Sequence, residues 1–313
     1  MNMYSYILRR LLYVIPVILG VCLIIFVLFN LVAPDPAFTL LGKHSTPEQI
    51  AQLHHELGMD RPYYVQYFDI VKSAFTFDFG YSWSSKQSIW EMIKLGAIPS
   101  LSITVPLYFI SNTLSIAIAL LVAFYRGTFL DKFVLVFTIS LMSISSMAYI
   151  LFGQWFFAYK LGWFEISGYE HGFPEFIPYV ILPVLLYTVI EIGPATRFFR
   201  TVILDEIYQD YVRTARAKGV GETLIMFKHV LKNAMVPILT FLIIEIPFLI
   251  LGLILVETFF SIPGLGGLTV KAINNSDFPV IKAMTVLSAV GFIVFNVLTD
   301  VLYTVVDPRM RLK

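Results

Sequence analysis

Long apolar blocks of sequence most restrict what this chain can fold into. Three blocks, 11–33, 98–125 and 133–159, contain no charged residue, and three more, 176–196, 234–260 and 283–306, contain one or two acids each. A helix needs about 20 apolar residues to cross roughly 30 Å of hydrocarbon, and every block reaches that length. Only 14% of the chain is charged, against about 25% in soluble proteins. Because no alternating strand pattern accompanies the blocks, the sequence predicts an all-α, polytopic membrane helix bundle with six transmembrane helices.

Basic residues flank the blocks unevenly, which predicts an orientation. Arg9 and Arg10 precede the first block, and with the N-terminus in the cytoplasm most flanking Lys and Arg residues fall on that side. Both termini are then cytoplasmic. The first block exceeds the roughly 7–15 apolar residues of a signal peptide, so we interpret it as a retained span. The predicted parts are the N-terminal tip with the first span (1–33), an extracytoplasmic loop subdomain (34–97), the other five spans with a polar loop at 199–236 (98–306), and a cytoplasmic tail (307–313).

Local signals predict structure in the loops outside the membrane. Thr46 followed by Pro47 is typical of a helix start, and Gly58 of a stop, which predicts a short helix over Pro47–Leu57. The aromatic segment Tyr63–Phe77 is expected to pack on the outer membrane face. Glycines and a proline at 263–267 predict a turn.

A basic polar insert separates the fourth and fifth blocks. Its apolar residues recur at helical spacing, at Leu204, Tyr208, Tyr211 and Ala215. This spacing predicts one amphipathic helix that stops at Gly219. A second short helix is expected from Glu222, before a span that begins at Pro237. Two such helices would form a rigid knob beside the membrane, although on pattern alone the insert could equally lie on anionic lipid.

Four acids lie inside the apolar blocks, where an ionisable group is a functional candidate because it is costly. Glu245 lies about 17 Å into its block by helical rise and two residues before Pro247, which loosens a helix. It either faces a central cavity and attracts a substrate cation, or it is paired to another helix or protonated. We interpret Glu257 chiefly as a partner of the outer loop, Asp300 as a structural partner of an arginine, and Glu191 as an interfacial group.

No nucleotide or metal motif is present in the sequence. A G-x-x-x-x-G-K-[ST] loop is missing, so ATP-derived energy would have to come from a partner. His54, His55 and Glu56 lack the spacing of a zinc site and are interpreted as a solvated polar helix. We therefore expect no catalytic residue, metal or cofactor.

Several segments in the correct order resemble one known family, the inner-membrane permease subunits of ABC importers of the peptide/nickel branch. Asp210–Gly219 (DYVRTARAKG) is similar to that branch's form of the permease coupling loop, and His229–Pro237 (HVLKNAMVP) to the end of the loop. Further matches are Ile7–Leu12 (ILRRLL), Leu57–Pro62 (LGMDRP), Leu161–Gly168 (LGWFEISG), Val256–Gly266 (VETFFSIPGLG) and Asp307–Arg311 (DPRMR). Where the family usually has Ser-Ile-Pro, this chain has Ser143-Ile144-Ser145.

The resemblance implies a type I ABC importer permease that forms half of a pathway for peptides or a related small solute, in the inner membrane of a bacterium. It implies that loop 204–236 carries a coupling helix that docks on a cytoplasmic ATPase. The implied contact residues are Tyr211, Arg213, Thr214, Ala215, Arg216, Lys218 and Gly219. Implied partners are a homologous second permease subunit, two ATPase subunits and an extracytoplasmic solute-binding protein, besides membrane lipid and without nucleic acid.

Glu245, Glu191 and Glu257 are the candidates for the translocation pathway. The main alternative is an ion-coupled secondary transporter that uses Glu245 and Glu191 as proton sites. Such a transporter usually shows an internal inverted repeat, which this sequence does not display. A membrane enzyme is a weaker alternative, because no paired catalytic set occurs at helical spacing.

Overall fold

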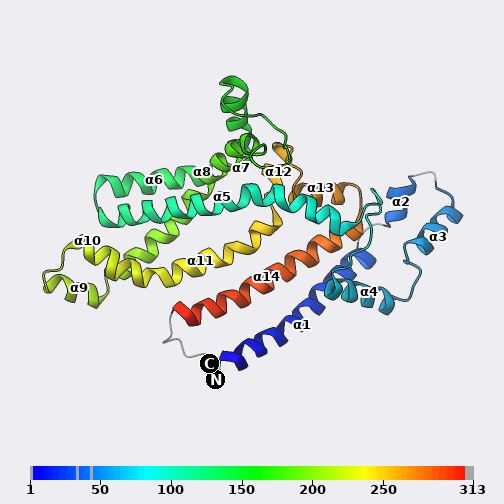
Figure 1. The fold of residues 1–313 in the computed structure, drawn as a ribbon, viewed down its shortest axis with the longest axis horizontal. Helices are drawn as coiled ribbons and strands as arrows, with labels where there is room; N and C mark the ends of the chain where they lie inside the picture. Colours follow the sequence, from blue (N-terminus) through cyan, green and yellow to red (C-terminus); the bar gives the residue numbers. More distant parts are fainter. Residues whose placement is uncertain (1–2, 33–34, 43–44, 307–313) are drawn as a thin grey trace.

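The computed structural model describes residues 3–32, 35–42 and 45–306, and this part of the chain is predominantly helical (Figure 1). Its α-helices are α1 (Met3–Val27), α2 (Pro36–Leu41), α3 (Pro47–Glu56), α4 (Tyr63–Thr76), α5 (Ile89–Phe124), α6 (Phe129–Ser143), α7 (Ser146–Gly153), α8 (Ile177–Ile207), α9 (Asp210–Ala217), α10 (Glu222–Leu224), α11 (Leu231–Leu251), α12 (Ile254–Phe259), α13 (Leu265–Asn274) and α14 (Phe278–Val306). Three π-helical segments join them, η1 (Leu28–Val32), η2 (Gln154–Lys160) and η3 (Ile225–Val230). Within the described ranges, β pairing is limited to an isolated bridge between Tyr81 and Ser88. The all-α prediction is confirmed.

Among the residues that the structure describes, five helices are long and apolar enough to cross a membrane. They are Leu12–Asn30, Ile89–Phe124, Ile177–Ile207, Glu222–Phe259 and Phe278–Leu298. A sixth span exists if Phe129–Ser143 and Ser146–Lys160 count as one, although the pair is bent by 88°. The predicted number of six spans therefore agrees with the structure only when this bent pair is one span.

The bend lies where the sequence shows one uninterrupted apolar block, 133–159. Ile144 has an extended backbone, with φ −92° and ψ 133°. The Ser143 hydroxyl donates to the Ile139 carbonyl at 2.9 Å, a bond that competes with the helical backbone. The Tyr149 hydroxyl donates to the Leu141 carbonyl at 3.1 Å, which satisfies an acceptor next to the break. Hydropathy does not register these contacts, so the block appears straight in the sequence.

The centre of the bundle is the pair α5 and α8, which pack along each other, with α6 against α8 and α11 against both α5 and α14. Helix α1 packs on α14 and α4. Helices α6 and α8 approach closely at Gly193, where an added Cβ would lie 3.2 Å from the Thr138 carbonyl oxygen. Small residues allow such approaches between helices in membranes.

Helices α9 and α10 lie at one end of the bundle, here called the α9 end, and α2, α3 and α13 lie at the other, the α13 end (Figure 1). The helix predicted to run from Leu204 to Ala215 is wrong, because α8 ends at Ile207 and α9 begins at Asp210. The short second helix is also wrong: it continues through η3 into α11, so that Pro237 lies inside a span instead of beginning one. Apolar spacing misses the first break because Ile207 and Val212, on either side of it, line the same core.

At the α13 end, the predicted helix Pro47–Leu57 is confirmed as α3. A reciprocal capping box between Thr46 and Gln49 starts it, and Gly58 follows its end with φ +68°. The turn predicted at 263–267 is wrong in its second half, because Gly266 and Gly267 lie in the first turn of α13.

Helix α4, in the aromatic segment 63–77, packs on α1. The Tyr67 hydroxyl donates to the Leu19 carbonyl at 3.1 Å, and Ile70 and Ala74 are buried in the same cluster as residues of α1. The placement of this segment on the outer membrane face, and the division of the chain into parts, stay predictions.

Candidate functional site

Helix α9 is a short amphipathic helix fixed on the bundle by its apolar face. Val212 is fully buried and Ala215 nearly so, in a cluster with Phe199 and Ile207 of α8. The cluster also contains Ile225 of η3, so α9 rests on the elements that precede and follow it. Because α9 packs on both α8 and η3, it is held as a rigid projection.

Two polar contacts tether the edges of α9. The Tyr211 hydroxyl donates to the Glu206 carboxylate, and burial together with this hydrogen bond raises the pKa of Tyr211 to about 12. The Arg216 guanidinium forms two bonds with the Glu222 carboxylate, the longer of them 3.3 Å. Gly219 has φ +75°, which lets the chain turn back toward α10. These contacts fix the direction in which α9 points.

The predicted coupling residues therefore divide into two groups. Ala215 is buried and Tyr211 and Arg216 are half-buried, whereas Arg213, Thr214, Lys218 and Gly219 are exposed. The Arg213 side chain is 72% exposed and pairs with Asp210 at 3.6 Å, an exposed pair of small energetic weight. The exposed surface of α9 is thus basic and polar.

Two of the predicted pathway acids line one cavity between α5, α8 and α11. Its volume is about 260 Å³, and its lining combines Glu191 of α8 and Glu245 of α11 with mostly apolar side chains. The Asn112 amide donates to the Glu245 carboxylate at 3.0 Å. Glu245 is therefore both a cavity residue and a partner of another helix, the two interpretations that the sequence left open. The interpretation of Glu191 as merely interfacial is wrong, because Glu191 lines the cavity.

Glu257 is held in a different place, in a buried network at the α13 end. It is 1% exposed and accepts hydrogen bonds from the Ser100 hydroxyl at 2.6 Å, the Gly267 amide at 2.8 Å and the Leu253 amide at 3.2 Å. Ser100 in turn accepts from the Leu265 amide at 2.8 Å. Glu257 thus fastens the start of α13 to α5 and α12, and its place in a pathway stays a prediction. The side chain of Asp300 and the motif 307–311 lie outside the described residues.

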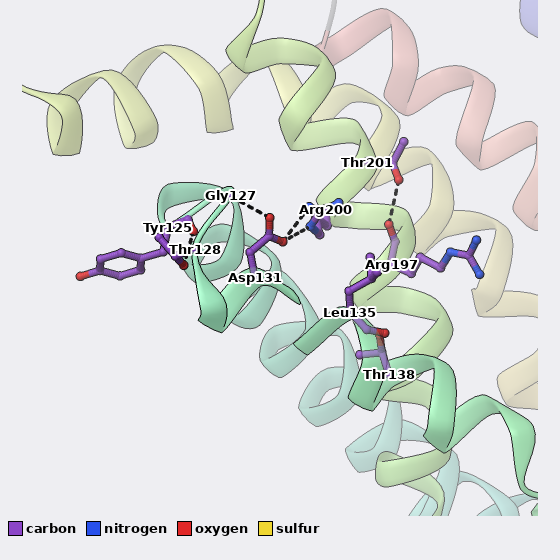
Figure 2. A network of polar contacts seen from close by, with 9 residues as sticks. All are labelled: Tyr125, Gly127, Thr128, Asp131, Leu135, Thr138, Arg197, Arg200 and Thr201. Atoms are coloured by element: carbon purple, nitrogen blue, oxygen red, sulfur yellow. Dashed lines mark hydrogen bonds and ion pairs between the residues drawn. The ribbon is translucent and has the colours of Figure 1, made fainter. Parts of the chain in front are cut away.

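The sequence did not single out the buried ion pair between Asp131 of α6 and Arg200 of α8, which Figure 2 shows. Its partners are 69 residues apart in sequence, so no local spacing could join them. The one available signal is an acid just after a tight connection between two apolar blocks. That connection, between α5 and α6, spans residues 125–128.

The two adjacent histidines have separate acidic partners. His54 Nε2 lies 2.8 Å from the Asp35 carboxylate, and His55 Nδ1 lies 2.7 Å from that of Asp60. The hydrogen bond from His55 lowers the pKa of Asp60. In the part of the chain that the structure describes, no group of three His, Cys, Asp or Glu residues could hold a metal ion.

Comparisons with known proteins identify a family. The family described as "Binding-protein-dependent transport system inner membrane component" matches residues 115–312, and its N-terminal counterpart matches residues 3–104. The chain is similar to the glutathione transport system permease protein GsiC of Salmonella typhimurium, at 33% identity over 99% of this chain and 100% of the relative. It is also similar to the probable peptide ABC transporter permease protein y4tP of Sinorhizobium fredii, at 34% over 98% and 99%, and to the dipeptide transport system permease protein DppB of Alkalihalophilus pseudofirmus, at 31% over 99% and 100%. Nothing in these relatives supports the alternative of an ion-coupled secondary transporter.

Proposed function

This chain belongs to the family of binding-protein-dependent transport system inner membrane components, and from that premise we propose that it forms half of the pathway of an ATP-driven importer for peptides or a related small solute. Its family makes it a transport subunit of the inner membrane that works with an ATPase and a solute-binding protein, not an enzyme. The finer assembly that we propose contains a second permease subunit, which is a homologue of this chain, and two ATPase subunits. In this assembly the α9 end faces the cytoplasm, and both termini are cytoplasmic.

The observation that carries the coupling role is the division of α9 into a fixed side and a free side. Val212 and Ala215 anchor the helix in the core, and Arg213 and Lys218 stand exposed on it. A helix that is packed on one side transmits a push as a rigid body instead of bending. Exposed cations can form charge-assisted bonds with carboxylates of an ATPase groove. We therefore assign the ATPase contact to the exposed residues and the positioning of α9 to Tyr211, Ala215 and Arg216.

The solute class follows from the cavity and from the names of the relatives. GsiC and DppB are named for glutathione and dipeptide transport, and such compounds carry an ammonium group. An acid within a membrane bundle attracts a cation because it has few other ways to offset its lost hydration. Glu245 and Glu191 would receive the ammonium group, while the apolar lining tolerates varied side chains. This tolerance favours a peptide-like solute over a single rigid compound.

The docking of α9 is tested by reversing its exposed charges. The assembled transporter is purified with either Arg213→Glu combined with Lys218→Glu in this chain, or the matched control Lys132→Glu, which reverses an exposed cation on α6. We expect the ATPase recovered with the permease to fall at least about tenfold in the double variant only, because like charges at a close interface cost several kcal/mol. Equal recovery of ATPase from the double variant and the control would overturn the assignment.

A further inference from the structure

We propose that Asp131 and Arg200 are a positioning pair that makes α6, α8 and α9 move as one body, so that ATP-driven motion of α9 reaches the cavity. The proposal rests on the coupling role of α9 proposed above. Neither residue touches the cavity or the exposed face of α9. The pair acts through the helices it joins, and its role is to transmit motion.

The contact engages both oxygens of the carboxylate. Asp131 Oδ1 accepts from Arg200 Nε at 2.9 Å and lies 2.6 Å from Arg200 Nη2, while Oδ2 accepts from the Gly127 amide at 2.9 Å. The Asp131 and Arg200 side chains are 10% and 21% exposed, so water screens the pair little. Gly127 lies in the connection between α5 and α6, with φ +78°. One carboxylate therefore joins the connection after α5, the first turn of α6 and the last third of α8 (Figure 2).

The position of Arg200 along α8 connects the two functional regions. Arg200 lies nine residues after Glu191, which is about 14 Å along a helix, and seven residues before Ile207, which is about 10 Å. Ile207 packs in the cluster that holds Val212 of α9. A displacement of α9 is thus passed to Arg200 before it reaches the cavity.

Apolar packing alone does not fix how α6 sits on α8. Ridges and grooves repeat at each turn, so two helices that slide by one turn can pack again. The ion pair has one register only, since a slide would separate the carboxylate from Arg200 Nε and Nη2 together and leave two largely buried charges without an ionic partner. The pair therefore sets a single arrangement that α6 and α8 keep while they move.

Arg197 provides a matched control on the same helix. It lies nearly one turn before Arg200, is exposed, and points away from Asp131 in Figure 2. Arg197→Gln removes a cation from the same face of the membrane without touching the pair. Any effect of general charge or lipid contact should appear in this variant as well.

The test compares Asp131→Asn, Arg200→Gln, the two combined, the exchange of the two residues (Asp131→Arg with Arg200→Asp) and Arg197→Gln. Each variant is reconstituted in vesicles as the full transporter with its ATPases and binding protein, and the ATP hydrolysed per solute imported is measured. We expect this ratio to rise at least about 5-fold, the lower range of coupling between sites, in the neutralised variants, to fall back toward the parent value in the exchange, and to stay unchanged in Arg197→Gln.

A purely structural role would reduce the amount of assembled complex, and hydrolysis and transport would fall in proportion, so the ratio would not change. An unchanged ratio in the combined variant overturns the proposal even if the exchanged variant does not assemble. Recovery of ATPase with the neutralised variants should equal that of the parent. Failure of the α9 docking hypothesis is visible separately, as full ATPase recovery in the Arg213 and Lys218 reversal.

Discussion

Replacing Glu257 by glutamine tests how the α13 end is held together, with almost no change in side-chain shape. In the native chain Oε1 accepts from the Ser100 hydroxyl and the Leu253 amide, and Oε2 accepts from the Gly267 amide. Glutamine has one oxygen and one NH₂ group. Whichever way the amide is turned, its NH₂ group faces a backbone N–H, either that of Leu253 or that of Gly267.

The size of the effect follows from the burial of the network. Glu257 is 1% exposed, so water does not replace the lost acceptor, and an unmatched buried donor costs about 1–3 kcal/mol. The amide also cannot move away, because Gly252, Gly264 and Gly266 pack directly on the carboxyl group. At roughly 2–4 °C per kcal/mol in chains of this order of size, the melting temperature should fall by about 2–12 °C.

The assay is thermal unfolding of the purified permease in detergent, and the loss of monodisperse protein is the readout. Glu91→Gln on the exposed side of α5 is the matched control, because it removes the same charge without a buried network. Ser100→Ala removes a donor to Glu257 and an acceptor of Leu265, so its effect should not add to that of Glu257→Gln. A melting temperature for Glu257→Gln equal to that of Glu91→Gln would refute the reasoning.

Three further predictions concern other sites. Glu245→Gln should lower import of a solute with a free amino group by about tenfold, the equivalent of about 1.4 kcal/mol. Import of an N-acetylated solute should fall less. An equal loss for both solutes would contradict a role of Glu245 in binding the ammonium group. Gly193→Val should weaken the contact between α6 and α8, because its Cβ would meet the Thr138 carbonyl oxygen at 3.2 Å, and thermal unfolding should occur at lower temperature than in Gly20→Val, where an added Cβ has open space. Burial would raise the pKa of Asp277, but hydrogen bonds from Ser82, Trp83 and Ser84 outweigh it and lower the pKa. The ionised Asp277 therefore stabilises the fold at any pH above the ordinary aspartate pKa. This stabilisation is lost as the pH falls through the pKa of Asp277 in the folded protein. The destabilisation by Asp277→Asn should accordingly be full at pH 7 and shrink in acid; a difference that grows in acid would show the opposite sign.

The sequence predicted those parts of the fold that depend on composition and on local signals. Spans follow from apolar length because a backbone in hydrocarbon must satisfy its own hydrogen bonds. The start of α3 follows from Thr46 and Pro47, since a cap is a contact between neighbours in sequence. The basic face of α9 follows from residue types alone. These features need no knowledge of what lies beside them.

The features that the sequence missed all depend on distant partners. Gly266 and Gly267 are typical of a turn, yet they are helical because the Glu257 carboxylate accepts the Gly267 amide at the start of α13. The join between η3 and α11 is continuous although Pro237 is typical of a helix start, because a proline within a span can be accommodated by neighbouring helices. Glu191 faces the cavity because α8 is turned by its packing on α5, which no single helix encodes.

Helix α5 is in contact with all three polar sites, which explains how a solute in the cavity could influence both ends. Ser100 near its start binds Glu257, Asn112 in its middle binds Glu245, and Gly127 just after its end binds Asp131. Asn112 is about 18 Å along the helix from Ser100. The contacts at the two ends are buried. In the middle, the Thr104 and Tyr108 hydroxyls donate to backbone carbonyls of α11, and the Asn112 amide donates one hydrogen bond to Glu245, an acid that a cation can draw away. We therefore expect solute binding to change the contact between α5 and α11 first, while α5, α6 and α8 stay together.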